Sequence, residues 1–71
     1  MTKVLDGRGL EPPQPFELVM EALADLESGG SITVLLSRVP YPLFRFLDRD
    51  GYPYSCEIRN DGVVEIRIDA P

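Results

Sequence analysis

The feature that most constrains the fold is a pair of alternating segments in the last third of the chain. Apolar and polar side chains alternate over residues 52–59 and again over residues 63–69, which is typical of strands with one buried face. Between them lies Asn60-Asp61-Gly62, a strong hairpin signal. Both strands carry their apolar side chains at even-numbered positions, so even-numbered residues must lie opposite even-numbered ones for these side chains to share a face. We therefore predict a three-residue loop with Gly62 in the left-handed conformation. The predicted buried face comprises Tyr54, Cys56, Ile58, Val64, Ile66 and Ile68.

Two amphipathic segments are predicted to cover that face. Apolar residues spaced by three and four predict a helix over residues 16–27, ended by Ser28-Gly29-Gly30. Pro42 is predicted to open a second helix that runs to Arg49 and is followed by Gly51. The inward-facing side chains are Phe16, Val19, Met20, Leu23 and Leu26 of the first helix and Leu43, Phe46 and Leu47 of the second. The opposite side of the first helix carries Glu17, Glu21 and Asp25.

Two further segments read as strands. Residues 2–6 precede a glycine-containing turn, and the continuous apolar run over residues 31–37 is typical of a strand inside a sheet. The element order is therefore βαβαββ in a single domain over residues 1–71. A βαβ crossover closed by an antiparallel hairpin predicts an α+β fold: a two-layer sandwich with both helices on one face of a four-stranded sheet.

Composition excludes several classes of function. The net charge of −5 disfavours nucleic acids and anionic membranes as partners. With one cysteine and no histidine, the chain offers no disulfide, no recognisable metal-ligand spacing and no histidine-based catalytic dyad. We therefore expect no catalytic residues, no metal and no cofactor, and a protein that is not an enzyme. The absence of a long apolar run near the start leads us to expect a reduced, cytoplasmic setting.

The single thiol, Cys56, lies between Tyr54 and Ile58 on the predicted buried face. We expect it to pack in the core as a small apolar side chain, with its pKa raised by burial.

The start of the chain resembles a known family. Leu5-Asp6-Gly7-Arg8-Gly9-Leu10, followed by Glu11-Pro12-Pro13-Gln14-Pro15, is similar to the signature of the TusA/SirA-like small sulfur carriers, in which Leu-Asp-x-Arg-Gly-Leu leads into Cys-Pro-x-Pro. The resemblance covers essentially the whole chain. It implies a mixed sheet of strand order 1-2-4-3 with the last strand antiparallel to the others.

The sequence departs from that signature at one position. Pro12 stands where the sulfur carriers have their cysteine, so no persulfide can form there. The chain most resembles a bacterial branch of the family, a domain of unknown function, in which Glu-Pro-Pro-x-Pro stands at this place. In that branch Pro-x-Pro-Leu opens the second helix, as Pro40-Tyr41-Pro42-Leu43 does here.

The implied strand order brings several polar loops to one edge of the sheet. Arg8 either holds a turn or presents a cation to a small anion, and Glu11 could pair with Arg8 or with the helix dipole. Tyr41, held between two prolines, suits contact with a partner or packing over the second helix. The candidate site for a ligand or partner is Arg8, Glu11, Pro12, Pro13, Gln14, Arg38, Tyr41 and Asn60.

These observations favour a small cytoplasmic binding or interaction module, related to the sulfur carriers but without their nucleophile, acting through the loop edge or the acidic helix. One alternative is a sulfur-relay or redox-linked carrier that works through Cys56 or a partner's thiol. A nucleic-acid binder is a further alternative that the net charge opposes. The expected partner is a protein, with a small molecule as the other option and neither nucleic acid nor membrane, and the expected state is a monomer or weak dimer.

Overall fold

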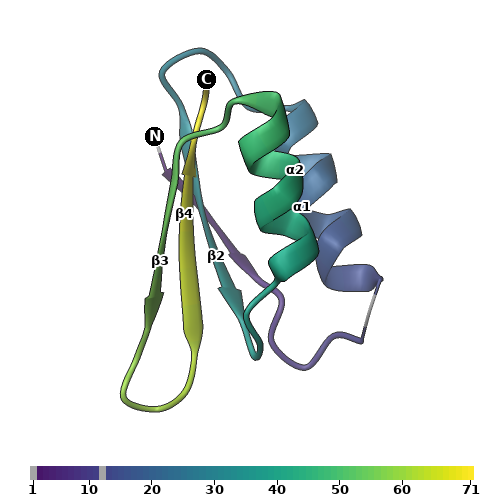
Figure 1. Ribbon diagram of the computed structural model, residues 1–71, viewed down its shortest axis with the longest axis vertical. Helices are drawn as coiled ribbons and strands as arrows, with labels where there is room; N and C mark the ends of the chain where they lie inside the picture. The colour runs from purple at the N-terminus through teal and green to yellow at the C-terminus, as the bar shows by residue number, and fades with distance from the viewer. Residues whose placement is uncertain (1, 12) are drawn as a thin grey trace.

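The computed structural model describes residues 2–11 and 13–71, and its elements follow the predicted order (Figure 1). None of the helices in these ranges is long and apolar enough to cross a membrane. The elements are β1 (Thr2–Asp6), α1 (Gln14–Ala24), β2 (Ser31–Leu36), α2 (Tyr41–Asp50), β3 (Tyr54–Ile58) and β4 (Val64–Asp69).

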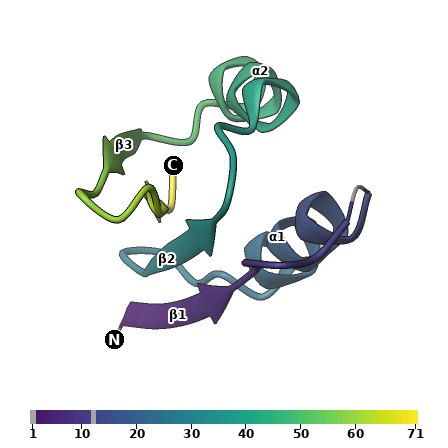
Figure 2. The ribbon, with the colours of Figure 1, turned by 90° about the horizontal axis from the view of Figure 1, so that it is seen from below.

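The four strands form one mixed sheet in the order β1-β2-β4-β3. β1 runs parallel to β2, and β4 is antiparallel to both β2 and β3. Both helices lie on one face of this sheet (Figure 2). The predicted α+β sandwich, and the strand order that the resemblance implied, are therefore confirmed.

The core lies between the sheet and the two helices. β2 and β4 are the central strands, and alternate residues along them face the helices, so their apolar side chains are the most deeply buried. The buried apolar residues are Leu5, Val19, Ala22, Leu23, Ile32, Val34, Leu36, Leu43, Leu47, Val64, Ile66 and Ile68.

The β3–β4 hairpin has the predicted register and turn. Ile58 pairs with Val64, so even-numbered residues oppose even-numbered ones. The Arg59 N–H donates to the Val63 carbonyl (2.9 Å) across a three-residue loop, and Gly62 adopts a φ of +87°. Asp61 fixes the loop further, because its carboxylate accepts a hydrogen bond from the Val63 N–H (3.0 Å).

Both helices begin earlier than predicted, and α1 also ends earlier. α1 starts at Gln14, which leaves Phe16 in the first turn and 36% exposed. At the other end the Leu26 N–H donates to the Leu23 carbonyl (3.1 Å), a tightened turn that takes the chain out of the helix before Ser28. α2 starts at Tyr41 and ends at Asp50, one residue later than predicted, and Gly51 follows it in the left-handed conformation.

The prediction that Cys56 and Ile58 are buried is wrong. Cys56 is exposed, and Ile58 is 62% exposed. Both face the helix side, opposite the buried Ile66 and Val64, but β3 is the end strand of the sheet. α2 contacts the start of β3 through Tyr54 and leaves the rest of that strand uncovered.

On the opposite face of the sheet, oppositely charged side chains are paired at some cross-strand positions only. Arg59 forms an ion pair with Glu65, and Ser55 stands opposite Arg67. Glu57, however, stands directly opposite Glu65. Like charges in that position are unfavourable.

Candidate functional site

Three loops meet at one end of the sheet, where β1, β2 and β3 terminate. Because β1, β2 and β3 run in the same direction, the loops after β1 and β2 and the β3–β4 turn lie at the same end of the molecule (Figure 1). We call this end the loop edge. It contains the described residues of the predicted site: Arg8, Glu11, Pro13, Gln14, Arg38, Tyr41 and Asn60.

Arg8 is held by Asp6, two residues before it. Its Nε and Nη2 donate to the two carboxylate oxygens of Asp6, each over 2.8 Å, and its backbone N–H donates to Asp6 Oδ1 over 3.1 Å. The suggested pairing of Arg8 with Glu11 is therefore wrong. A two-pronged bond of this kind fixes the guanidinium in direction and neutralises its charge.

The pKa values at this pair follow from the same contacts. The hydrogen bonds from the Arg8 side chain and backbone lower the pKa of the Asp6 carboxyl to about 2. The hydrogen bond to Asp6 and the charge of Asp6 raise the pKa of Arg8, and the Asp61 carboxylate adds to this attraction. Arg8 thus serves as a positioning residue for its turn, and it presents little free charge to an anion.

The loops after β1 and β2 are joined to each other. The Gly7 N–H donates to the Leu35 carbonyl (2.8 Å), which extends the pairing of β1 and β2 by one residue. The Gly9 N–H then donates to Ser37 Oγ (3.4 Å) in the loop after β2. Gly9 itself has a φ of +80°, a conformation that favours glycine. These bonds preorganise the loop edge without a ligand.

An aromatic ladder, which we define as Tyr41, Phe44 and Tyr54, runs from Tyr41 at the loop edge to Tyr54 at the start of β3. Tyr41 is 66% exposed and meets Phe44 edge to face, with 6.3 Å between ring centroids. Phe44 stacks on Tyr54 with centroids 5.0 Å apart and planes inclined by 10°. Tyr41 is therefore a supported aromatic ring that remains open to a partner.

The other predicted site residues carry less information. Glu11, Pro13, Gln14, Arg38 and Asn60 are all exposed. The Glu11 carbonyl accepts a hydrogen bond from the Gln14 N–H (2.9 Å), which forms the turn into α1. Pro12 lies outside the described residues, so its predicted place at this edge is untested.

Sequence reasoning missed the roles of Asp6, Phe44 and Tyr54. Asp6 lies two residues before Arg8, and at this spacing an Asp carboxylate can accept a hydrogen bond from the backbone N–H of the later residue. The sequence spacing could therefore have predicted this contact. Phe44 lies three residues after Tyr41, so the two rings share a helix face. The stacking of Phe44 on Tyr54 joins segments that no local pattern relates.

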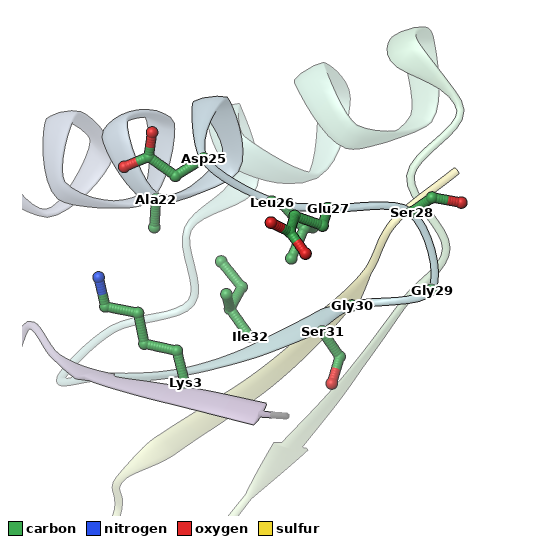
Figure 3. Close-up of a pocket in the computed structure, with 10 residues that line it drawn as sticks. All are labelled: Lys3, Ala22, Asp25, Leu26, Glu27, Ser28, Gly29, Gly30, Ser31 and Ile32. Carbon is green, nitrogen blue, oxygen red and sulfur yellow. The ribbon is translucent and has the colours of Figure 1, made fainter.

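A separate groove lies at the opposite end of the molecule, between the end of α1 and the starts of β1 and β2 (Figure 3). It encloses about 300 Å³, and among the described residues that line it Lys3 is the only basic one. None of the described residues of the predicted site lines it. The lining residues are Lys3, Ala22, Asp25, Leu26, Glu27, Ser28, Gly29, Gly30, Ser31 and Ile32.

The Cys56 thiol is accessible but not activated. It lies on the helix-facing side of β3, opposite Ile66, and partial desolvation raises its pKa, as expected. A raised pKa lowers the fraction of nucleophilic thiolate at neutral pH. Within residues 2–11 and 13–71, no group of three His, Cys, Asp or Glu side chains is placed to hold a metal ion.

The fold places the chain in the class of small SirA-like α+β proteins. The chain is similar to the SirA-like protein of Desulfitobacterium hafniense, whose crystal structure it matches with a TM-score of 0.86 and 32% identity over 99% of this chain and 97% of that one. Residues 4–70 match the family described as "Uncharacterized conserved protein (DUF2249)". The protein therefore belongs to that family. No curated protein matches the chain.

Proposed function

We propose that this protein is a small binding module that presents its loop edge to a protein partner, and that it does not carry sulfur at the mouth of α1. In the signature that the chain resembles, a cysteine occupies the position of Pro12, and proline offers no nucleophile for carrying sulfur. What remains at this edge is a rigid surface.

The observation that carries the proposal is the combination of a neutralised Arg8 with an exposed Tyr41. Asp6 uses both carboxylate oxygens on Arg8, which disfavours binding of a small anion. Tyr41 is 66% exposed yet supported from below by Phe44. Tyrosine and arginine are enriched among the residues that dominate protein interfaces, and Arg38, which is exposed and three residues before Tyr41, supplies the arginine.

The experiment first identifies a partner protein and then maps the residues of this chain that bind it. Proteins retained from the native cell on the immobilised wild-type chain are identified, purified and titrated against variants by calorimetry. We expect Tyr41→Ala and Arg38→Ala each to weaken binding by about tenfold or more. Val4→Ala is the matched control, because Val4 is a large exposed apolar residue on β1, away from the loop edge.

Two outcomes would contradict the proposal. In one, Tyr41→Ala and Arg38→Ala bind as tightly as the wild type although circular dichroism shows that they are folded. In the other, only Glu21→Gln weakens binding, which would move the interface to the acidic face of α1.

One observation favours the second candidate, a sulfur relay through Cys56, because the thiol is exposed. In such a relay the Cys56 thiolate would take the terminal sulfur of a donor persulfide and release the donor as a thiolate. The raised pKa of Cys56 opposes this step. Mass spectrometry after incubation with a persulfide donor decides between the binding module and the relay. A mass increase of one sulfur atom in the wild type that is absent from Cys56→Ser would support the relay.

A further inference from the structure

The outer edge of β3 has the properties of a strand that pairs with another strand. The Asp69 N–H donates to the Pro53 carbonyl and the Arg59 N–H to the Val63 carbonyl, each over 2.9 Å. Odd-numbered residues of β3 therefore turn their backbone groups toward β4, and Tyr54, Cys56 and Ile58 turn theirs away from the sheet. Such a row of N–H and C=O groups is a template for a further strand.

This edge has little of the usual protection, since Glu57 is the one charged residue within β3 and Pro53 stands just before the strand. Edge strands are commonly shielded by lysine, proline or a covering segment. β1, the other end strand, carries Lys3, whereas the sequence of β3 is Tyr-Ser-Cys-Glu-Ile. Its last residue, Ile58, is 62% exposed on the helix-facing side. An exposed apolar residue beside open backbone groups favours a partner that supplies both hydrogen bonds and apolar cover.

We propose that β3 pairs in antiparallel fashion with β3 of a second copy of this chain, about a two-fold axis at Cys56. β3 lies at the open side of the sheet (Figure 1), so the two four-stranded sheets would form one continuous sheet. This interface is separate from the loop edge and does not depend on the proposed function.

The sequence of β3 is complementary to itself in this register. Cys56 stands beside Cys56, Tyr54 beside Ile58, and Ser55 beside Glu57, so no like charges meet. Every outward N–H and C=O of Tyr54, Cys56 and Ile58 gains a partner. The exposed Ile58 of one copy is covered by the Tyr54 ring of the other, a ring already held by its stacking on Phe44.

The neighbouring registers are less favourable. The pleat allows shifts only in steps that keep even-numbered residues opposite even-numbered ones. A shift toward the end of β3 places Glu57 opposite Glu57 of the second copy, which is repulsive. A shift toward its start places Ile58 opposite Tyr52, which precedes β3, so Ile58 has no partner within the strand. The register centred on Cys56 is the one that satisfies both the backbone and the side chains.

Sedimentation velocity over a range of protein concentrations tests the proposal through a matched pair of variants. Ser55→Lys places a positive charge opposite Glu57 of the second copy, twice per dimer, and should tighten the dimer by about 2- to 30-fold. Ser55→Glu places like charges there and should weaken it by a similar factor. Within one chain Ser55 stands opposite Arg67, so the same changes should shift the stability of the monomer in the opposite direction.

A second measurement tests the register directly. Diamide oxidises two thiols to a disulfide and is itself reduced to a hydrazine. Cα atoms in a hydrogen-bonded antiparallel pair are about 5.5 Å apart, within the range that a disulfide spans. In the control, Cys56→Ser combined with Ser55→Cys moves the thiols to diagonal positions about 8 Å apart, beyond that range. The wild type should form disulfide-linked dimers faster than the control.

The outcomes separate cleanly. A dimer that Ser55→Lys tightens and Ser55→Glu weakens, with faster cross-linking at position 56, supports the proposal. A wild-type protein that stays monomeric at every concentration overturns it, and so does equal cross-linking at the two positions. Open-ended assemblies larger than a dimer would show pairing of β3 with β1 of the next copy, which also overturns it.

Discussion

Gly7 lies so close to Leu36 that a Cβ atom on Gly7 would stand 2.7 Å from Leu36 Cδ2 and 3.4 Å from the Leu35 carbonyl oxygen. Leu36 is buried and cannot move away freely. We expect Gly7→Ala to lower the free energy of unfolding by about 1–3 kcal/mol, measured by urea denaturation. The control is the Leu36→Val background, in which the cost of Gly7→Ala should fall. An equal cost in both backgrounds would contradict the steric explanation.

The Asp6–Arg8 pair makes stability depend on acid pH. The pKa of Asp6 is lowered from 3.8 to about 2 in the fold, so its contribution to stability is complete above pH 3.8 and is lost as the pH falls toward 2. Carboxyl carbon shifts followed by NMR should show this low pKa. In Arg8→Gln the pKa should return toward its ordinary value, and a wild-type pKa already near 4 would show that the pair does not form in solution.

The exposed Cys56 should react in the folded protein. We expect a small maleimide to label Cys56 completely without denaturant in dilute protein, since the side chain is accessible. Because the pKa of the thiol is raised, labelling at pH 7 should be slower than for a free cysteine and should accelerate as the pH rises. Labelling only after denaturation would instead indicate the buried cysteine that the sequence pattern predicted.

Glu57 and Glu65 stand directly opposite each other on β3 and β4. Glu57→Gln removes one of the two charges without changing the size of the side chain, and it should raise the free energy of unfolding by about 0.2–1 kcal/mol. Thermal unfolding at low ionic strength measures the effect. The difference in stability between Glu57→Gln and the wild type should shrink in concentrated salt, because salt screens exposed charges. A stability gain that persists in concentrated salt would contradict the electrostatic explanation.

The candidate site could be predicted only in part from the sequence. Its loops were expected at one edge because the resemblance implied the strand order, and the structure places them there. The partner of Arg8 was not predicted, although Asp6 lies only two residues before it, and the structure shows that the turn brings Arg8 onto Asp6 and not onto Glu11. The support of Tyr41 by Phe44 and Tyr54 depends on where α2 lies over the sheet.

The sequence by itself determined the features that depend on neighbouring residues. The βαβαββ order, the even-to-even hairpin register and the left-handed Gly51 and Gly62 follow from periodicity and turn chemistry. Only the tertiary structure decided which apolar face is covered. Cys56 and Ile58 alternate as core residues do, yet they are exposed, because β3 ends the sheet and α2 contacts only its start. Alternation shows which side of a strand a residue occupies, whereas burial depends on what packs against that side.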